Sequence, residues 1–340
     1  MISVILEFLG ETGMIKFSIV VCTAGDAKYL SKCLQSLHHN VDMSTAEVLV
    51  VDNNQDDKHH FKLLEMAGEY NFRYVREMSP GLSTARHTGV MNSLGEVISF
   101  IDDDVIVSDT WFNALVDVFK NNKVVLAGGP SFPSYEKQPP KWVRSSFQTE
   151  FNQGKSCMWL SLLNLCVDIE NVNPMLIWGL NFNIRRQILI QLGGFNPDLV
   201  PKEYQAYQGD GESALTSKIK LHNLRADYIQ NLSVSHMISS NRLKVDYLKA
   251  RAFYQGVGLS FIRKKNLTLR HTLWIEHVTK VLKIVAALLK FQFCLAYFKF
   301  NWLISENRGY RWHSKQYKTS AKIRDWVQIK NYFGEKIPID

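Results

Sequence analysis

Apolar runs of strand length alternate with segments of helical periodicity through the first 130 residues of the chain. Most of these runs are continuously apolar, which is typical of strands covered on both faces. Between them, apolar residues recur at the spacing of a helix face. Strands that alternate with helices of about 10–12 residues predict a mostly parallel sheet flanked by helices. The predicted strands are 16–22, 47–51, 72–75, 98–105 and 124–127, and the predicted helices are 27–37, 57–67, 82–93 and 109–120.

The middle of the chain has a less regular pattern. Residues 129–173 contain four prolines, and we expect loops that cover one edge of the sheet. An alternating strand is predicted at 177–184, and one or two strands at 225–236. Between these segments, a helix is expected to begin just after Asp210, with Glu212 in its first turn.

From residue 241 onward the pattern is helical and the charge is strongly basic. Helices are predicted at 247–263 and 271–300, and the second is apolar but interrupted by several charged residues. No window offers about 20 uninterrupted apolar residues, so a membrane-spanning helix is not predicted. Residues 241–340 carry a formal charge of +14, whereas residues 1–240 carry −6. This basic region either binds something anionic or is a solvated face, and its helices pack on the body or lie in a membrane interface.

The overall composition is ordinary for a globular protein of 340 residues, of which 46% are hydrophobic. Its five cysteines are scattered without CxxC spacing, so neither a zinc site nor a disulfide framework is predicted, and a reducing cytoplasm is the expected setting. Residues 1–13 lack the basic start of a signal peptide and are expected to be an N-terminal extension. Neither a dinucleotide-binding glycine motif nor a P-loop is present.

Polar residues follow three of the predicted strands. Asp102, Asp103 and Asp104 close the strand at 98–105, while Thr23 and Asp52 close two others. Strand alternation predicts that Asp102 and Asp104 lie on one side and Asp103 on the other. Paired carboxylates favour a hard divalent cation, Mg²⁺ or Mn²⁺, that also holds a substrate phosphate. A solvated acidic turn is the alternative, but ligands of parallel sheets bind at the carboxyl ends of strands, which favours a site.

Five segments, in this order, resemble the family 2 glycosyltransferases. They are 17–34, 50–53, 81–89, 100–104 and 179–195. The resemblance implies an α/β fold of the GT-A type, with a Rossmann-like mixed sheet that is mostly parallel and flanked by helices. It places this domain at residues 14–240, with a donor half at about 14–130 and an acceptor half at about 131–240. Residues 241–340 would form a basic, helical C-terminal extension.

The resemblance also implies a metal-dependent, inverting transfer from a nucleotide-diphospho-sugar, with a UDP-sugar favoured, to a hydroxyl acceptor. Asp210 would be the general base, with Glu212 as the alternative. Mg²⁺ or Mn²⁺ would be bound by Asp102 and Asp104, with His236 as a candidate third ligand. The implied donor-binding residues are Thr23, Asp52, Arg86, Asp103, Trp178, Gly179 and Asn181.

Three positions depart from the family pattern. Ala24-Gly25 follows the first strand where Tyr-Asn is usual, Gly209 precedes Asp210 where Glu is usual, and His87 replaces a common Asn. The expected partners are a nucleotide-sugar donor and a carbohydrate or lipid-linked acceptor in surface polysaccharide or glycolipid biosynthesis, and no nucleic acid. We expect a cytoplasmic protein that binds peripherally to the inner face of the plasma membrane if its C-terminal helices contact lipid. A non-catalytic glycan- or membrane-binding protein and a sugar nucleotidyltransferase are the alternative functions.

Overall fold

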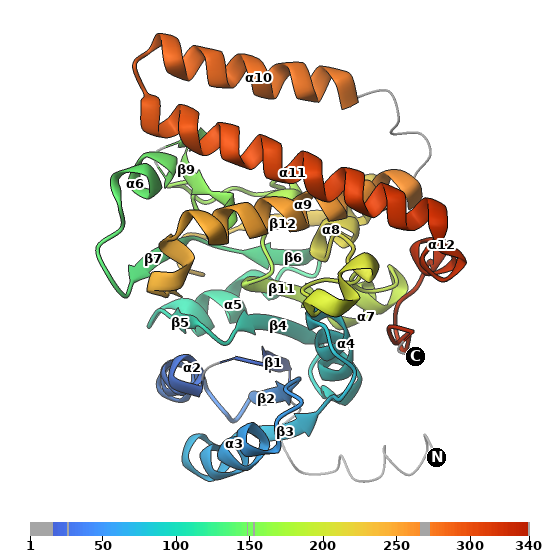
Figure 1. Cartoon of the computed structure of the whole chain (residues 1–340). Coiled ribbons are helices and arrows are strands. Elements are labelled where there is room, and N and C mark those ends of the chain that lie inside the picture. The colour runs from blue at the N-terminus through green and yellow to red at the C-terminus, as the bar shows by residue number, and fades with distance from the viewer. Residues whose placement is uncertain (1–15, 26, 148, 152–153, 266–272, 339–340) are drawn as a thin grey trace.

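The computed structural model describes residues 16–25, 27–147, 149–151, 154–265 and 273–338. A seven-stranded sheet lies at its centre, flanked by helices, with a layer of C-terminal helices beyond them (Figure 1). All neighbouring strands are parallel except β11, which runs antiparallel to both of its neighbours. The predicted fold class, a mostly parallel mixed sheet with flanking helices and a C-terminal helical extension, is confirmed. In spatial order the strands are β12 (Arg225–Tyr228), β6 (Val124–Gly128), β11 (Asn181–Arg185), β4 (Val97–Asp102), β1 (Phe17–Thr23), β2 (Ala46–Asp52) and β3 (Arg73–Arg76).

Apolar residues cover both faces of this sheet, as the continuous runs predicted. Along β1, Ile19 and Val21 belong to the core on one face and Val20 to the core on the other. Because side chains alternate along a strand, those on one face pack against one layer of helices and those on the other face pack against the second layer. The first face is covered by α2 (Ala27–Asn40), α3 (Asp57–Tyr70) and α5 (Trp111–Phe119), and the second by α4 (Leu82–Asn92), α7 (Arg186–Gln191) and α8 (Glu212–Leu221).

Four strands of a second, six-stranded sheet lie within residues 129–173, where only loops were predicted, so that prediction was wrong for these segments. The strands are only three to five residues long, and β7 contains Pro133, so no clear alternation marks them in the sequence. Their pairing also depends on a strand about 100 residues away, since β7 pairs with β13. In spatial order the sheet comprises β5 (Val105–Val107), β13 (Val234–Ile238), β7 (Ser131–Tyr135), β10 (Leu162–Asn164), β9 (Gly154–Cys157) and β8 (Thr149–Phe151), with α6 (Lys141–Phe147) beside it.

The acidic triplet lies where the chain passes from one sheet to the other. Strand β4 ends at Asp102, Asp103 and Asp104 form a turn, and β5 begins at Val105. The single strand predicted at 98–105 is therefore wrong, and side-chain alternation does not extend past Asp102. A main-chain hydrogen bond from Met237 N to Asp104 O, 2.8 Å, attaches the turn to β13.

The C-terminal helices form a layer of their own. Helix α11 (Phe293–Thr319) lies along α9 (Val245–Lys265), and α10 (Leu273–Leu289) lies on the outer side of α11 (Figure 1). Gly256 and Gly309 permit the close crossing of α9 and α11, because a Cβ on either would collide with a carbonyl oxygen of the other helix. The single helix predicted at 271–300 is divided near Phe291, whose φ is +54°. Among the described residues, no helix is both long and apolar enough to cross a membrane.

The chain then returns to the sheet domain through α12 (Ala321–Gln328) and residues 329–338. Trp326 Nε1 donates a hydrogen bond to Tyr207 O at 2.9 Å, and Phe333 stacks on His87 with ring centroids 4.2 Å apart. The C-terminal region is thus packed on residues 14–240 at several points. The domain boundary near residue 240 stays a prediction.

Candidate active site

Three neighbouring cavities lie beside the carboxyl ends of the central strands. The triplet cavity, about 300 Å³, lies over the ends of β1 and β4 and contains Thr23 and all three carboxylates of the triplet. The central cavity, about 230 Å³, contains Arg86, Gly179, His236 and Glu212. The Asp210 cavity, about 150 Å³, is bounded by α8 and α9. The three cavities form one continuous row, because neighbouring cavities share lining residues. The triplet and central cavities share Leu82, Asp102, Leu199 and Arg242. The central and Asp210 cavities share Trp159, Asp198, Glu212, Arg251 and Tyr254.

Each carboxylate of the triplet has a different partner. Thr23 Oγ1 donates to Asp103 Oδ2 at 2.6 Å, Arg86 Nη2 donates to Asp102 Oδ1 at 3.1 Å, and Arg242 Nη2 lies 2.6 Å from Asp104 Oδ2. Burial raises the pKa of Asp102 and Asp103, the latter to about 7. Burial opposes ionisation of Asp104 too, yet its pKa is lowered because His236 and Arg242 face it. Each acid thus has a separate partner, and the charge of Asp104 still adds to the raised pKa of Asp102 and Asp103.

Arg86 links the triplet to the loop before β11. Its guanidinium is buried, donates to Gly179 O at 2.9 Å, and lies over the rings of Phe100 and Phe195. A Cβ at Gly179 would lie 2.8 Å from Arg86 Nη2, so the approach of the guanidinium requires glycine there. The pKa of Arg86 is raised despite burial because Asp102 and Glu212 surround it.

His236 and Asp104 have the donor atoms that a divalent cation needs. His236 Nδ1 bonds to Leu160 O at 2.8 Å, which leaves Nε2 as an acceptor. Nε2 lies 3.3 Å from Asp104 Oδ2, and the Arg242 guanidinium contacts both atoms, at 2.7 Å from Nε2. The positively charged guanidinium of Arg242 thus contacts both acceptor atoms, and the same imidazole nitrogen and carboxylate oxygen are suitable ligands for Mn²⁺ or Mg²⁺. Among the described residues, no three His, Cys, Asp or Glu side chains form a preformed metal site.

Asp210 and Glu212 both face the Asp210 cavity, and Glu212 also faces the central cavity. Asn196 Nδ2 donates to Asp210 Oδ1 at 2.6 Å. Burial raises the pKa of Asp210 to about 6, a rise limited by Asn196 and the charge of Lys265. Glu212 instead accepts a hydrogen bond from Gly179 N at 3.2 Å and lies 3.9 Å from Arg86, and burial raises its pKa as well. Asp210 is thus the carboxylate without a cationic partner in direct contact.

Three predicted donor-binding residues do not line this row of cavities. Asp52 is fully buried, and its carboxylate accepts hydrogen bonds from Tyr74 Oη at 2.8 Å and Asn54 N at 3.0 Å, with His59 Nδ1 at 3.1 Å. Asn181 is buried and hydrogen-bonded to Trp111 Nε1 and Leu232 O, and Trp178 donates to Met175 O. Their roles in donor binding stay predictions.

Other residues of these cavities carried no clear signal in the sequence. Asp198, Tyr247 and Tyr254 line the central cavity because loops and α9 bring them there, at positions that no short motif marks. Arg251, also on α9, differs from them because its charge makes it a candidate for contact with a diphosphate, and it lines both the central and the Asp210 cavities. Only the pairing of α9 with the sheet domain reveals these side chains.

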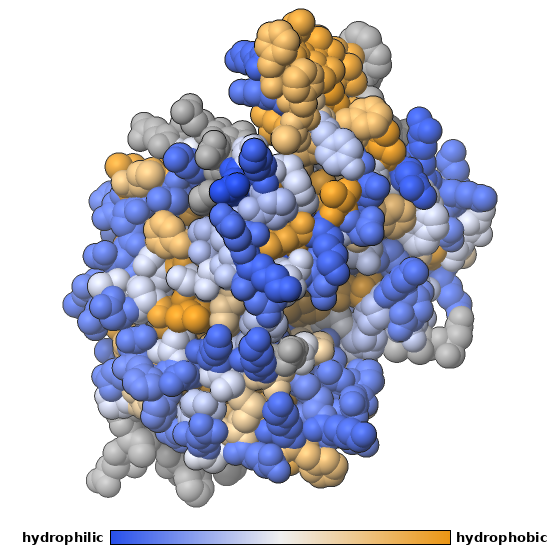
Figure 2. All heavy atoms as spheres, turned by 60° about the vertical axis from the view of Figure 1, so that its left-hand side comes forward, coloured by the Kyte–Doolittle hydropathy of each residue, from blue (hydrophilic) through white to orange (hydrophobic). Residues whose placement is uncertain are grey.

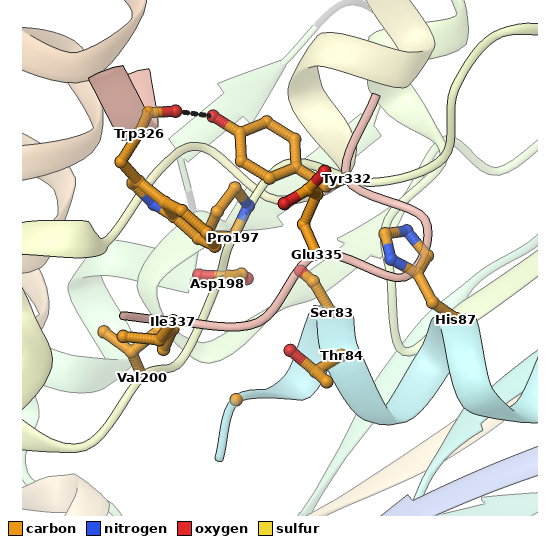
Figure 3. Close-up of a pocket in the computed structure, with 11 residues that line it drawn as sticks. Ser83, Thr84, His87, Pro197, Asp198, Val200, Trp326, Tyr332, Glu335 and Ile337 are labelled. Carbon is orange, nitrogen blue, oxygen red and sulfur yellow. Dashed lines mark hydrogen bonds between the residues drawn. The ribbon is translucent and has the colours of Figure 1, made fainter. Parts of the chain in front are cut away.

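A much smaller cavity lies where the C-terminal tail crosses α4 (Figure 3). Its volume is about 10 Å³, which is room for about one water. Tyr332 Oη donates to Trp326 O at 2.6 Å on one side of it, and His87 stands on the other. His87 Nε2 accepts from Phe195 N at 2.9 Å, and burial lowers the pKa of His87 to about 4, so it is a neutral packing residue. This explains how a histidine replaces the asparagine usual in the family.

Part of the sequence that lines this row of cavities matches a known sequence family. Residues 18–190, slightly more than half of the chain, match the sequence model of glycosyl transferase family 2. The chain belongs to this family. The resemblance inferred from the five segments is thereby confirmed.

Curated relatives match only part of the family member described here. This chain is 28% identical over 116 residues to an uncharacterized glycosyltransferase, EpsJ, of Bacillus subtilis (strain 168), and the match covers 33% of this chain and 32% of the relative. It is 28% identical over 100 residues to the succinoglycan biosynthesis protein ExoM of Rhizobium meliloti (strain 1021), covering 29% and 32%. The match thus spans about a third of these relatives' length. A solved structure, GalNAc-T7 with UDP, GalNAc and Mn²⁺, is 14% identical with a TM-score of 0.49, covering 76% of this chain and 52% of that one.

Proposed function

We propose that this family member is a metal-dependent, inverting glycosyltransferase that uses a nucleotide-diphospho-sugar, with a UDP-sugar favoured, in polysaccharide or glycolipid biosynthesis. The observation that carries the proposal is the row of cavities, which runs from the acidic triplet past three arginines, Arg86, Arg242 and Arg251, to a carboxylate of raised pKa. That order matches what the reaction needs: a diphosphate site, an anomeric carbon beside it, and a base facing the acceptor.

The nucleotide half of the donor is assigned to the triplet cavity. Asp102 and Asp104, with His236, would hold Mg²⁺ or Mn²⁺, which supplies charge neutralisation for the leaving diphosphate. Arg242 must leave Asp104 for this to occur, and its guanidinium, which lines both the triplet and central cavities, is then free to pair with a phosphate. Arg86 and Arg251 also line the central cavity, so three arginines surround it.

The chemical step is assigned to the junction of the central and Asp210 cavities. The acceptor hydroxyl oxygen attacks the anomeric carbon while the bond from that carbon to the diphosphate oxygen breaks. The leaving nucleoside diphosphate takes the electron pair, and the hydroxyl proton passes to Asp210. A single displacement inverts the anomeric configuration. Asp210, with a pKa of about 6, is ionised at neutral pH but basic enough to accept the proton.

The outer helix α10 supports binding to a membrane surface. Together with the start of α11 it forms the hairpin tip, residues 288–293, where Leu289, Phe291 and Phe293 are 75%, 80% and 61% exposed. Figure 2 shows these helices as an apolar projection at the top of the view, with hydrophilic residues beside it. Apolar side chains flanked by lysines are typical of helices that lie in a lipid interface. The protein would then be peripheral on the inner face of the plasma membrane, with α9 and α11 packed on its body.

A thermal-shift panel tests the proposed function. UDP is expected to raise Tm in the presence of Mn²⁺ but not in its absence, and to do so more than the other nucleoside diphosphates. Slow, Mn²⁺-dependent hydrolysis of a UDP-sugar is the second readout, because it needs no knowledge of the acceptor. If no nucleoside diphosphate shifts Tm with either metal, the proposed function is wrong.

A further inference from the structure

A further cavity, the apolar cavity, lies between the C-terminal helices and the second sheet. Its volume is about 410 Å³, which is within the range of ligand-binding pockets. Most of its lining is apolar, from Met158, Trp159, Leu259, Phe298 and Leu303. It belongs neither to the triplet cavity nor to the central cavity, so the proposed donor site does not account for it.

The apolar cavity is the next member of the row described above. Met158, Trp159, Gln255 and Trp302 line both it and the Asp210 cavity. The two spaces are therefore separated by no more than these side chains. A molecule whose hydroxyl reached Asp210 would meet the apolar cavity with its opposite end.

Three lysines form the rim of the apolar cavity beneath α10. Lys280 is paired with Glu306, whereas no described carboxylate pairs with Lys283 or Lys299. Burial lowers the pKa of Lys299, and the nearby charges of Lys283 and Lys290 lower it further. Cations held together in this way attract an anion, since each would be stabilised by the same negative charge.

An unpartnered donor lies at the boundary between the two cavities. Trp159 is 4% exposed, and its Nε1 has no hydrogen-bond acceptor among the described residues. The indole is fixed by stacking on Trp142 at 5.4 Å and by contact with Phe298. Because a buried N–H without a partner is unfavourable, an oxygen of a bound ligand is the expected acceptor.

We propose that the apolar cavity is an acceptor subsite that takes the hydrocarbon chain of a lipid-linked acceptor, while Lys283 and Lys299 bind its phosphate. This inference rests on the proposed function, because it names the class of acceptor whose hydroxyl reaches Asp210. The apolar lining excludes a purely polar oligosaccharide from this space, and the lysine pair distinguishes a phosphate-bearing lipid from a neutral one.

The test is the binding of dodecyl phosphate, used below its micelle concentration, to the full chain. A dibrominated form reports the location, because bromine quenches the fluorescence of the indoles at Trp159 and Trp302. Dodecyl phosphate is expected to bind at least about tenfold more tightly than dodecanol, since a charged hydrogen bond is lost in the alcohol. Methyl phosphate, which lacks the chain, is expected to bind at least about a hundredfold more weakly.

Two variants separate the cavity from the rest of the basic surface. Changing Lys283 and Lys299 to Ala is expected to weaken dodecyl phosphate binding about tenfold or more. The matched control changes Lys315 and Lys318 to Ala, which removes the same charge from exposed positions on α11 outside the cavity, and is expected to change binding less than about twofold. Leu303→Trp, which fills the cavity, is expected to abolish binding, with Tm confirming that the variant is folded.

Equal binding of dodecyl phosphate and dodecanol, or equal weakening by the two lysine pairs, would overturn the subsite. UDP-sugar hydrolysis without acceptor should be unchanged in the Lys283/Lys299 variant. Absence of hydrolysis in the wild-type protein would instead contradict the proposed function and leave the dodecyl phosphate result as it stands. The two failures are therefore distinguishable.

Discussion

Replacing Asp210 with Asn should lower activity and raise stability at the same time. Folding raises the pKa of this carboxyl from 3.8 to about 6, mainly through burial. The folded state therefore binds a proton more tightly than the unfolded state, so folding stability is highest below pH 3.8. It falls as pH rises through about 6 and is then constant. Above pH 7 the ionised carboxylate is a fixed cost to the folded protein.

The size of this cost follows from the shift. A rise of about two pKa units corresponds to ~3 kcal/mol. Asp210 lines a cavity, and solvent screening reduces the figure to roughly 1–2 kcal/mol. Asparagine keeps an oxygen that can accept the hydrogen bond from Asn196. D210N should therefore gain roughly 1–2 kcal/mol at pH 8, or about 2–6 °C in Tm, and the gain should vanish near pH 4.

The same change removes the proposed general base. Turnover of the UDP-sugar at saturating donor and Mn²⁺ should fall by about 10²–10⁴-fold. In the wild-type protein kcat should rise with pH to a plateau above about 6, as Asp210 ionises, and D210N should lack this limb. The measurements are release of nucleoside diphosphate between pH 5 and 9 and thermal unfolding at pH 4 and 8.

Glu212→Gln is the control, since Glu212 faces the same cavity but is held beside Arg86. It should reduce turnover while keeping the pH limb near 6. Near-normal turnover in D210N, or loss of the limb only in E212Q, would make Glu212 the base. A pH-independent Tm difference between D210N and wild type would show that burial does not control the ionisation of Asp210.

Three further predictions concern the metal, the membrane and the sheet. Asp104→Asn should abolish the Mn²⁺-dependent part of the UDP-induced Tm shift, because the amide is a weaker ligand than the carboxylate; an unchanged shift would exclude Asp104 as a ligand. Leu289→Gln should reduce sedimentation of the protein with anionic liposomes several-fold. The control, Leu221→Gln, changes a residue that is 77% exposed on the body and should not reduce sedimentation. Equal effects of the two changes would contradict binding through the hairpin tip. Asp52→Ala should destabilise the protein by about 2–4 kcal/mol in urea unfolding, because Tyr74 Oη loses its buried acceptor; a change below about 0.5 kcal/mol would refute this.

The central sheet could be predicted because each of its strands carries its own signal. A parallel strand buried on both faces must be continuously apolar, as Ile19, Val20 and Val21 are, whichever strands pair with it. The second sheet gives no such signal. Strand β10 has three residues, and β7 is stabilised by β13, whose sequence lies about 100 residues later. Short strands of this kind exist only through their partners, so local periodicity cannot reveal them.

The candidate active site also combines residues that short motifs mark with residues that only the folded structure brings there. Short motifs predict roles for Asp102, Asp104 and Asp210, and all three line the row of cavities, while their roles stay predictions. Arg242 could not be placed against Asp104 from sequence alone, since its position depends on the turn between β13 and α9. Nor could the sequence show that the carboxylate of Asp52 accepts a hydrogen bond from Tyr74 and lies 3.1 Å from His59 Nδ1; its role in donor binding stays a prediction.

The basic C-terminal region contributes to the site as well as to the surface. Helix α9 supplies Arg251 and Tyr254 to the central and Asp210 cavities, and Lys265 at its end lowers the pKa of Asp210. Helix α10 packs mainly on α11, and Leu282, Leu288 and Leu289 on it are exposed. Removing residues 241–340 would therefore take away one wall of the proposed active site together with the hairpin that is proposed to bind a membrane. A membrane contribution is best measured by changes confined to the hairpin tip, because its exposed residues Leu289, Phe291 and Phe293 line neither the apolar cavity nor any cavity of the row.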